Sequence, residues 1–405
     1  MGGEPPQDPE TAEYNLINSP LLLYVVTEDW YFATHRLTLA RAAAQAGYRV
    51  AVACRTHDHE EALRAAGCEV IPFPFARSGT DPTQEIRTYL RLASLYRARR
   101  PALVHHVAMK PVLYGSYAAW QTGVPGVVNA INGLGMLSTG QDPKTRLLRA
   151  AVVTALGRVN RRPNVRVLVQ NPDDERMVAS TGIAASHQIT RLPGVGVNLS
   201  RFAPSPEPAG TPIVLLSARM LLAKGVGTFV EAAGRLTAEG IRARFVLAGR
   251  TDPENPTSVP EAQLRDWARS GAVEWWGHRE DMDDVLRSAA IVCLPSAYGE
   301  GIPKALLEAA AAGRPIVTTD IPGCREVVRP GETGLLVPPK DPVALAAALR
   351  DLLSDPMKRA RFGAAGREMA EAEFDERAVI RTTLGVYATL LRRAGIAPVP
   401  GEGSY

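Results

Sequence analysis

The sequence predicts an α/β protein with two Rossmann-like domains that face a central cleft. Segments of strand character alternate with helical segments along most of the chain, which is typical of parallel sheets covered by helices. The chain has 405 residues, about twice the size of a common domain. Proline and glycine crowd together between residues 192 and 210, which favours a linker between the two domains there.

Each predicted strand is a short apolar run, as is typical of a buried strand. In the first half of the chain these runs cover residues 21–26, 50–54, 70–71, 103–106, 126–130 and 165–169. In the second half they cover residues 212–216, 244–248, 273–276, 291–294, 316–319 and 334–337. Because ligands of such sheets bind at the carboxyl ends of the strands, two facing domains would enclose a binding cleft.

We place an N-terminal domain at residues 20–200 and a C-terminal domain at residues 201–375. Residues 1–19 are polar and rich in proline, and they lack the basic and apolar regions of a signal peptide. They are therefore expected to form a disordered tail. A second tail is expected at residues 397–405.

The composition excludes several classes of protein. Hydrophobic residues make up 46% of the chain and charged residues 22%, which indicates a globular protein, and the net charge of +4 is too small to indicate nucleic-acid binding. No run of 18 apolar residues predicts a membrane-spanning helix. The four cysteines form no CxxC pair, so we expect reduced thiols in the cytoplasm. The acidic pairs at residues 173–174 and 283–284 lack a strand-end context, so no metal is expected.

Residues 27–35, which follow the first predicted strand, contain no glycine. A dinucleotide pyrophosphate needs glycine at this point so that the backbone can approach it closely. The sequence therefore argues against a dehydrogenase, although that class of enzyme commonly uses Rossmann-like domains.

Two carboxylates stand at a predicted junction between a loop and a helix. Glu300 follows the apolar run 290–295, whereas Glu308 belongs to a helix with Pro303 in its first turn and Gly313 at its end. Glu308 lies in an otherwise apolar run and would be costly to bury without a hydrogen-bonding partner, for which a diol is suitable. Taken singly, Glu308 is better explained as a solvated helix residue and Glu300 as a turn residue.

This pair, a Glu followed by seven residues and a second Glu, with Gly-x-Pro after the first, resembles the signature of retaining nucleotide-sugar glycosyltransferases of the GT-B fold. The resemblance implies that Glu308 holds the ribose hydroxyls of the donor and that Glu300 faces the transferred sugar. It also implies that the last helix, residues 376–396, crosses back onto the N-terminal domain. The expected donor site includes backbone N–H groups at the helix start, and its loop residues are Gly301, Ile302 and Pro303.

A cationic loop follows the first strand of the second half. Arg219 and Lys224 lie between that strand and the next helix, an order that suits a diphosphate. Both cations would neutralise charge on a departing nucleoside diphosphate. The loop also resembles the Arg-x4-Lys-Gly motif of the same family, and its alternative explanation is two solvated cations.

Two further segments resemble parts of the donor site. The segment 276–279 resembles the one that lines the nucleobase pocket, so Arg279 either contacts the base or caps a turn. The segment 249–256, which begins with Gly249, resembles one found in enzymes that extend undecaprenyl-diphosphate-linked sugars. The segment 319–326 fits the same narrower group.

The first half is expected to supply the acceptor side of the cleft. The segments 28–36 and 105–111 both lie at predicted strand ends. His106 is a candidate catalytic residue, although tandem histidines are often structural, and Lys110 either meets an acceptor phosphate or begins a helix. Many relatives have a histidine after the strand 126–130, where this chain has Asn132, which would act by hydrogen bonding alone.

A basic segment at residues 144–162 surrounds an apolar stripe. It either lies on an anionic membrane surface or packs on the domain with a solvated basic face. Its cations are Lys144, Arg146, Arg149, Arg158, Arg161 and Arg162.

The resemblance implies a retaining hexosyl- or N-acetylhexosaminyltransferase that moves a sugar from a nucleoside diphosphate, UDP being the expected one, to a polyprenyl-diphosphate-linked saccharide at the cytoplasmic membrane surface. No cofactor beyond the donor substrate is expected. The expected catalytic residues are Glu300, Lys224, Arg219 and His106. The alternatives are a nucleotide-sugar epimerase, a phosphorylase, for which no pyridoxal-phosphate lysine is evident, and a non-catalytic nucleotide-sugar-binding component.

Overall fold

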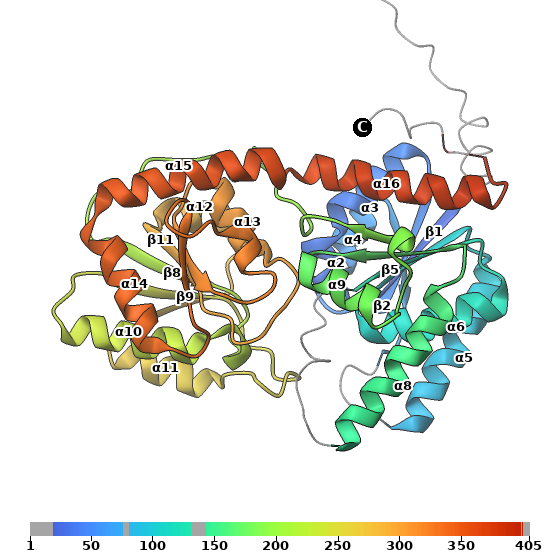
Figure 1. The fold of residues 1–405 in the computed structure, drawn as a ribbon, viewed down its shortest axis with the longest axis horizontal. Helices are drawn as coiled ribbons and strands as arrows, with labels where there is room; N and C mark the ends of the chain where they lie inside the picture. Colours follow the sequence, from blue (N-terminus) through green and yellow to red (C-terminus); the bar gives the residue numbers. More distant parts are fainter. Residues whose placement is uncertain (1–18, 76–80, 132–142, 398, 400–405) are drawn as a thin grey trace, which may run out of the picture.

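The computed structural model describes residues 19–75, 81–131, 143–397 and 399. Figure 1 shows two parallel sheets, each flanked by helices, side by side as two domains. The predicted α/β class with two Rossmann-like domains is confirmed. Residues 1–18 and 400–405 of the predicted tails, and Asn132, lie outside the described residues.

The first sheet has seven parallel strands in the order β3-β2-β1-β4-β5-β6-β7. The strands are β1 (Leu21–Glu28), β2 (Arg49–Arg55), β3 (Cys68–Pro72), β4 (Leu103–Val107), β5 (Gly126–Ala130), β6 (Val165–Val169) and β7 (Ile189–Arg191). The prediction missed β7 because two of its three residues are polar. The central strand β1 is buried on both faces: between residues 21 and 26, even-numbered side chains pack into one core and odd-numbered side chains into another.

The second sheet has six parallel strands in the order β10-β9-β8-β11-β12-β13. The strands are β8 (Ile213–Ser217), β9 (Arg244–Ala248), β10 (Glu274–Gly277), β11 (Ile291–Leu294), β12 (Ile316–Thr319) and β13 (Gly334–Val337). In both sheets the strand order reverses beside a central strand, at β1/β4 and β8/β11. Loops after these strands diverge to opposite faces of the sheet, which leaves room for a ligand at the carboxyl ends.

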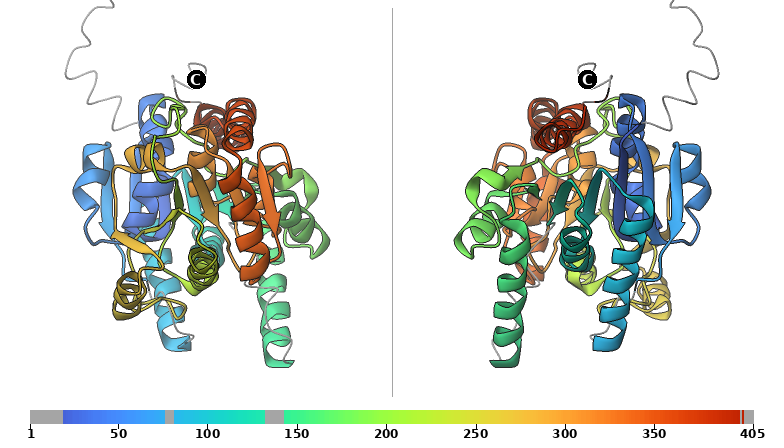
Figure 2. Two further views of the ribbon diagram at one scale, coloured as in Figure 1. Left: turned by 90° about the vertical axis from the view of Figure 1, so that its left-hand side faces the viewer. Right: turned by 90° about the vertical axis from the view of Figure 1, so that its right-hand side faces the viewer.

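Helices cover both faces of each sheet (Figure 2). Those of the first domain are α2 (Asp29–His35), α3 (Leu37–Ala46), α4 (Glu60–Ala65), α5 (Pro82–Arg99), α6 (Met109–Thr122), α8 (Pro143–Asn160) and α9 (Pro172–Ser180). Those of the second are α10 (Val226–Ala238), α11 (Glu261–Arg269), α12 (Met282–Ser288), α13 (Lys304–Ala311), α14 (Pro342–Ser354) and α15 (Pro356–Glu373). Short 3-10 turns cover Ser186–Gln188, Leu222–Lys224 and Arg325–Val327.

Where the structure describes the capping residue, four helices begin with an Asp or Asn followed by proline, a combination that satisfies a free backbone N–H and pre-sets the first helical residue. In each case the side chain accepts a hydrogen bond from a backbone N–H two or three residues further on. The capping residues are Asp81, Asn171, Asp341 and Asp355.

The last helix, α16 (Glu376–Arg393), returns to the first domain, where it lies beside α3 along one edge of the molecule (Figure 1). Its apolar side chains pack into the core that also contains β1. Within that core the Tyr387 hydroxyl lies 3.1 Å from the Tyr24 hydroxyl and 2.6 Å from His105 Nδ1. The helix therefore ties the end of the chain to the first sheet. Within the described residues, no helix is both long enough and apolar enough to span a bilayer.

Candidate active site

The loop after β8 brings two cations to the carboxyl end of the second sheet. Beyond the end of β8, the chain passes Arg219 and the 3-10 turn that ends at Lys224 before α10 begins. Gly225 (φ 77°) follows that turn, and a Cβ atom there would lie 1.9 Å from the carbonyl oxygen of Pro295. Glycine is needed here because a side chain would push apart the loops after β8 and β11.

Glu300 lies on the loop after β11 and is held by two side chains. Its carboxylate forms an ion pair with Lys224 and accepts a 2.7 Å hydrogen bond from the Ser296 hydroxyl. Its backbone N–H donates to the carbonyl oxygen of Pro322 (3.2 Å). Two residues that were predicted from separate motifs, 76 positions apart, therefore meet in the structure.

Glu308 lies on α13, the helix that follows the Glu300 loop in the second domain. Pro303 is the residue before its first helical position, so it does not lie in the first turn as predicted, whereas Gly313 follows the helix end as expected. The Glu308 side chain is only 10% exposed, and its carboxylate lies 3.1 Å from Lys304 Nζ. Lys304 therefore offsets part of the cost of burying this carboxylate.

Residues at the end of β6 hold the Glu300 loop from the first domain. Gln170 Oε1 accepts a 3.0 Å hydrogen bond from the Ile302 N–H, and Asn171 Nδ2 donates to the carbonyl oxygen of Glu300 (3.2 Å). In this structure the Ile302 N–H bonds to Gln170, and the role expected for Ile302 in donor binding stays a prediction. The role expected for Gly301 in donor binding stays a prediction.

Arg219 is held between an acidic residue of its own domain and an aromatic residue of the other. One guanidinium nitrogen lies 2.5 Å from Asp252 Oδ2, and the guanidinium carbon lies 5.2 Å from the centre of the Trp30 ring. Asp252 belongs to the loop after β9 and Trp30 to α2. A diphosphate that binds Arg219 therefore competes with Asp252 or shares the guanidinium with it.

Gly249 and Arg279 lie at neighbouring strand ends with different surroundings. A Cβ atom at Gly249 would lie 1.8 Å from the carbonyl oxygen of Ala218, so this glycine lets the loops after β8 and β9 pack together. Arg279 forms an ion pair with Asp281, and its Nε lies 2.7 Å from that carboxylate. Nucleobase binding by Arg279 stays a prediction.

Two family descriptions match the two domains in turn. "Glycosyl transferase 4-like" matches residues 22–161, and "Glycosyl transferases group 1" matches residues 211–355. The chain belongs to the group 1 glycosyltransferases. Its two facing Rossmann-like domains form the GT-B fold expected of that family.

Relatives of this glycosyltransferase differ in how much of it they match. N,N'-diacetylbacillosaminyl-diphospho-undecaprenol alpha-1,3-N-acetylgalactosaminyltransferase of Campylobacter jejuni is 28% identical, over 88% of this chain and 95% of its own. Phosphatidyl-myo-inositol mannosyltransferase of Mycobacterium leprae is 34% identical, over 48% of this chain and 52% of its own. The first match spans both domains, whereas the second spans about half of each protein.

Solved structures share the fold of this glycosyltransferase at low sequence identity. HepE of Anabaena in complex with UDP and glucose superimposes with a TM-score of 0.74 at 16% identity, over 91% of this chain and 99% of its own. Sucrose-phosphate synthase of Thermosynechococcus elongatus has a TM-score of 0.74 at 21% identity, over 92% of this chain and all of its own (100%). Both matches span the two domains.

His106 is part of the core of this glycosyltransferase, so its proposed catalytic role is wrong. The ring is fully buried, and its Nε2 and Nδ1 atoms lie 2.9 Å from the Tyr96 hydroxyl and 2.7 Å from Asn129 Oδ1. Burial lowers the pKa of His106 to about 4. His105, on the opposite face of β4, bonds to Tyr387. The two adjacent histidines therefore form hydrogen bonds in the cores on opposite faces of the first sheet.

His35 belongs to the segment 28–36, which was predicted to lie at a strand end, and it is the last residue of α2. Its ring stacks on Tyr31 at 4.3 Å, and its Nδ1 lies 3.1 Å from the carbonyl oxygen of the same residue. Burial, followed by the positive charge of Lys304, lowers the pKa of His35 to about 3, and Lys224 acts in the same direction. The His35 imidazole of the first domain therefore lies close enough to Lys304 and Lys224 of the second domain for their charges to lower its pKa.

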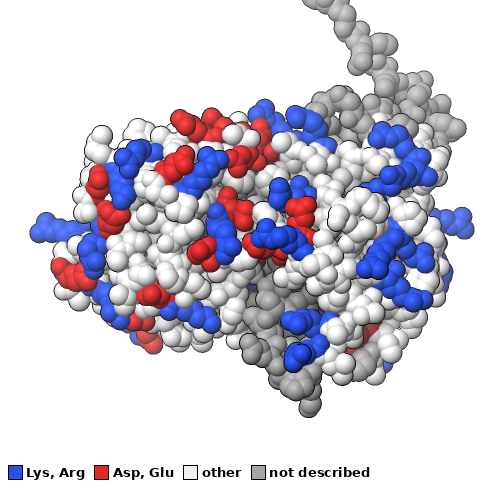
Figure 3. Space-filling model, viewed as in Figure 1, with Lys and Arg blue, Asp and Glu red and all other residues white. Residues whose placement is uncertain are grey.

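The cations of the first domain are divided between ion pairs and a broad basic surface. Lys110 Nζ lies 2.6 Å from Glu85 Oε1, so this lysine already has an anionic partner. On α8 and just after it, the guanidiniums of Arg158 and Arg162 lie 5.9 and 4.3 Å from the centre of the Trp120 ring. Figure 3 shows mainly Lys and Arg on the first-domain half of this face, whereas both signs of charge intermix on the other half.

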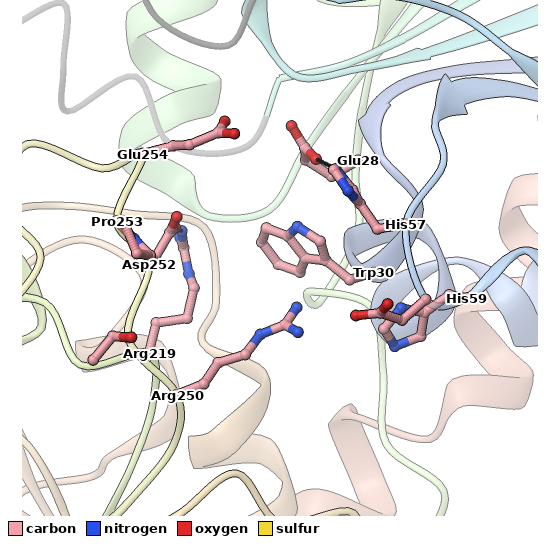
Figure 4. A pocket seen from close by; sticks show the side chains of 11 residues that line it. Glu28, Trp30, His57, His59, Arg219, Arg250, Asp252, Pro253 and Glu254 are labelled. Atoms are coloured by element: carbon pink, nitrogen blue, oxygen red, sulfur yellow. Dashed lines mark hydrogen bonds and ion pairs between the residues drawn. The ribbon is translucent and has the colours of Figure 1, made fainter. Parts of the chain in front are cut away.

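A pocket of about 350 Å³ opens between the domains of this glycosyltransferase (Figure 4). Its walls are the end of β1, the start of α2 and the loop after β2 on one side, and the loops after β8 and β9 on the other. Arg219 belongs to this lining, so the pocket adjoins the cations predicted to bind the diphosphate. Among the described residues, no group of three or more His, Cys, Asp or Glu side chains is arranged to hold a metal ion.

Proposed function

We propose that this glycosyltransferase moves a hexose or N-acetylhexosamine from a UDP-sugar to a hydroxyl of a polyprenyl-diphosphate-linked saccharide, with retention of anomeric configuration. The observation that carries this proposal is the meeting of Lys224 and Glu300 at the carboxyl end of the second sheet, beside Arg219. Cations for a diphosphate and a carboxylate for a sugar stand there on adjacent loops. The donor would be the only small molecule required besides the acceptor.

In this proposal the bond between the anomeric carbon and the diphosphate oxygen breaks first, through an oxocarbenium-like state. Lys224 and Arg219 stabilise the negative charge that develops on the departing diphosphate. The acceptor hydroxyl attacks the same face of the sugar, and its proton passes to the released diphosphate oxygen. Retention follows because the bond forms on the face from which the old one left.

The carboxylates take separate parts in binding the donor. Glu308, nearly buried on α13, would accept hydrogen bonds from the ribose hydroxyls, for which a charged acceptor is especially suitable. Glu300 would face the sugar once the diphosphate takes over its cation, Lys224. Both assignments rest on the resemblance to the Glu-x7-Glu signature, and the position of the two side chains on one loop and its helix is consistent with them.

The relatives support the choice of donor and acceptor. HepE, which shares the fold, is described in complex with UDP and glucose, and the Campylobacter enzyme is named for an acceptor with a diphospho-undecaprenol group. A lipid-linked acceptor would place the enzyme at the cytoplasmic face of a membrane, where the basic surface of the first domain suits anionic lipids. A role in surface polysaccharide or glycan assembly is consistent with such an acceptor.

The test is a panel of UDP-sugars incubated with undecaprenyl-diphosphate-linked N-acetylhexosamine in detergent, followed by NMR of the product. We expect one donor to give a disaccharide product with the anomeric configuration of the donor. An inverted linkage would contradict the mechanism. Release of UDP and free sugar without any transfer would indicate an epimerase, and tight donor binding without turnover would indicate a binding component.

A further inference from the structure

The pocket between the domains is built around Trp30, and its wall is organised by one buried carboxylate. Asp29 is fully buried, and its carboxylate accepts hydrogen bonds from the backbone N–H groups of Trp30 (2.6 Å), His57 (2.6 Å) and His59 (3.2 Å). Asp29 thereby fixes the start of α2 against the loop after β2. The aromatic residue and both histidines of the lining are held in place by these bonds.

The indole of Trp30 stands between polar groups of the opposite domain. The guanidinium carbons of Arg219 and Arg250 lie 5.2 and 5.6 Å from the centre of its ring. Figure 4 shows both arginines reaching towards Trp30 from the second domain. Within the described part of the chain, Arg219 has Asp252 as an ion-pair partner, whereas Arg250 forms no ion pair. Arg250 thus keeps guanidinium donors for a ligand.

The charges of the lining argue against a second anion. The lining contains four carboxylates and two guanidiniums, so the surplus is negative. Three carboxylates have a cationic partner within reach: Asp252 pairs with Arg219, and both Glu254 and the buried Glu28 pair with Arg55. The Glu28 carboxylate also lies 3.3 Å from His57 Nε2. Paired carboxylates still accept hydrogen bonds from hydroxyl groups, because each has lone pairs left over. The carboxylates are Glu28, Asp58, Asp252 and Glu254.

An aromatic ring surrounded by planar polar side chains suits a sugar ring, whose C–H face is apolar and whose hydroxyls both donate and accept. We propose that this pocket binds the saccharide of the acceptor, with Trp30 beneath the ring and Arg250 donating to its hydroxyls. The proposal rests on the proposed function, which assigns Arg219 to the donor diphosphate. Because Arg219 also lines the pocket, an acceptor ring there would lie next to the departing group.

The experiment is saturation-transfer difference NMR on the full chain loaded with UDP, using four methyl α-glycosides as probes: those of glucose, galactose, N-acetylglucosamine and N-acetylgalactosamine. We expect at least one glycoside to receive saturation in the wild type. Trp30→Ala should reduce that signal at least fivefold, Trp30→Phe should keep part of it, and the matched control Arg235→Ala on the exposed face of α10 should leave it unchanged. Titration calorimetry of UDP should give affinities within about twofold for all four proteins.

Several results would overturn the proposal. These are the absence of saturation for every glycoside, an undiminished signal in Trp30→Ala, and displacement of the glycoside by inorganic diphosphate, which would make the pocket a phosphate site. Loss of the glycoside signal when UDP is replaced by a UDP-sugar would show that the sugar of the donor occupies the pocket. Failure of the wild type to bind UDP would instead count against the proposed function, so the two failures are distinguishable.

Discussion

The carboxyl ends of the two sheets hold their polar residues in different ways. In the second domain, Arg219, Lys224 and Glu300 follow their strands on loops, stay partly exposed and form ion pairs at the domain surface. In the first domain, His105 and His106 lie inside β4, are fully buried and bond to core side chains. A polar residue beyond the end of a strand therefore reaches the cleft, whereas one within a strand buried on both faces belongs to the core.

The largest effect is expected at the diphosphate cation. Replacing Lys224 with alanine removes a positive charge that would stabilise the leaving group, so we expect kcat to fall roughly 100- to 1,000-fold. Steady-state kinetics with saturating donor and acceptor measure this. Arg235→Ala, which removes an exposed cation paired with Glu231 on α10, should change kcat less than twofold, and a similar fall in both variants would remove the distinction between cleft and surface cations.

The opposite outcome is expected for the first-domain histidine. His106→Leu leaves the Tyr96 hydroxyl and Asn129 Oδ1 without their His106 partner in the core, so we expect the free energy of unfolding to fall by roughly 3 kcal/mol. Urea denaturation measures that loss, and kcat per folded molecule should stay within about twofold. If His106→Leu does not fold, His106→Gln, which keeps hydrogen-bonding groups, serves for the same comparison. A catalytic defect in a stable His106→Gln protein would return this histidine to the site.

The same histidine predicts a pH dependence of stability. Its pKa is about 4 in the folded protein, against 6.5 as the ordinary value. Between these two pH values the unfolded chain binds more protons than the folded one, so stability falls as the pH is lowered from 6.5 towards 4. His106 alone accounts for about 3 kcal/mol over that range.

Unfolding in urea at several pH values tests this slope. His106→Gln removes the titrating group and should flatten the dependence relative to the wild type, although other buried histidines still contribute. An unchanged slope in this variant would show that His106 is not the group responsible.

The smallest effect is expected from an ion pair across the cleft. Arg55 forms two hydrogen bonds with Glu254, at 2.7 and 2.8 Å, but the Glu254 side chain is 49% exposed. Exposed ion pairs contribute little because water and salt screen them, so Glu254→Gln should cost about 0.5 kcal/mol of unfolding free energy. A loss above about 2 kcal/mol would mean that this pair, rather than the loop after β6, holds the domains together.

Most of the fold follows from local sequence patterns. Apolar runs mark the strands of both sheets because parallel strands are covered by helices on both faces. β7 was not predicted because a short edge strand such as Ile189–Arg191 has no apolar run. Helix starts at an Asp or Asn followed by proline are equally local, since the cap and its acceptor lie within three residues.

Site residues could be predicted only where the sequence shows the position of their motif relative to a strand. Lys224 and Glu300 could be placed at the carboxyl end of one sheet because both motifs follow central strands, but their ion pair was not predicted. Gln170 and Asp252 could not be paired with their partners either, because their roles depend on contacts between loops that lie far apart in the sequence. Trp30 was visible at a strand end, but its setting between two arginines depends on how the domains face each other.

The central claim is that the loop after β8 binds the diphosphate of the donor, and comparing UDP with uridine tests it most directly. We expect calorimetry to show that the wild type binds UDP at least tenfold more tightly than uridine. In Arg219→Ala and Lys224→Ala this advantage should largely disappear, while uridine affinity stays the same. Variants that keep the full preference for UDP would contradict the account, because the diphosphate would then bind elsewhere.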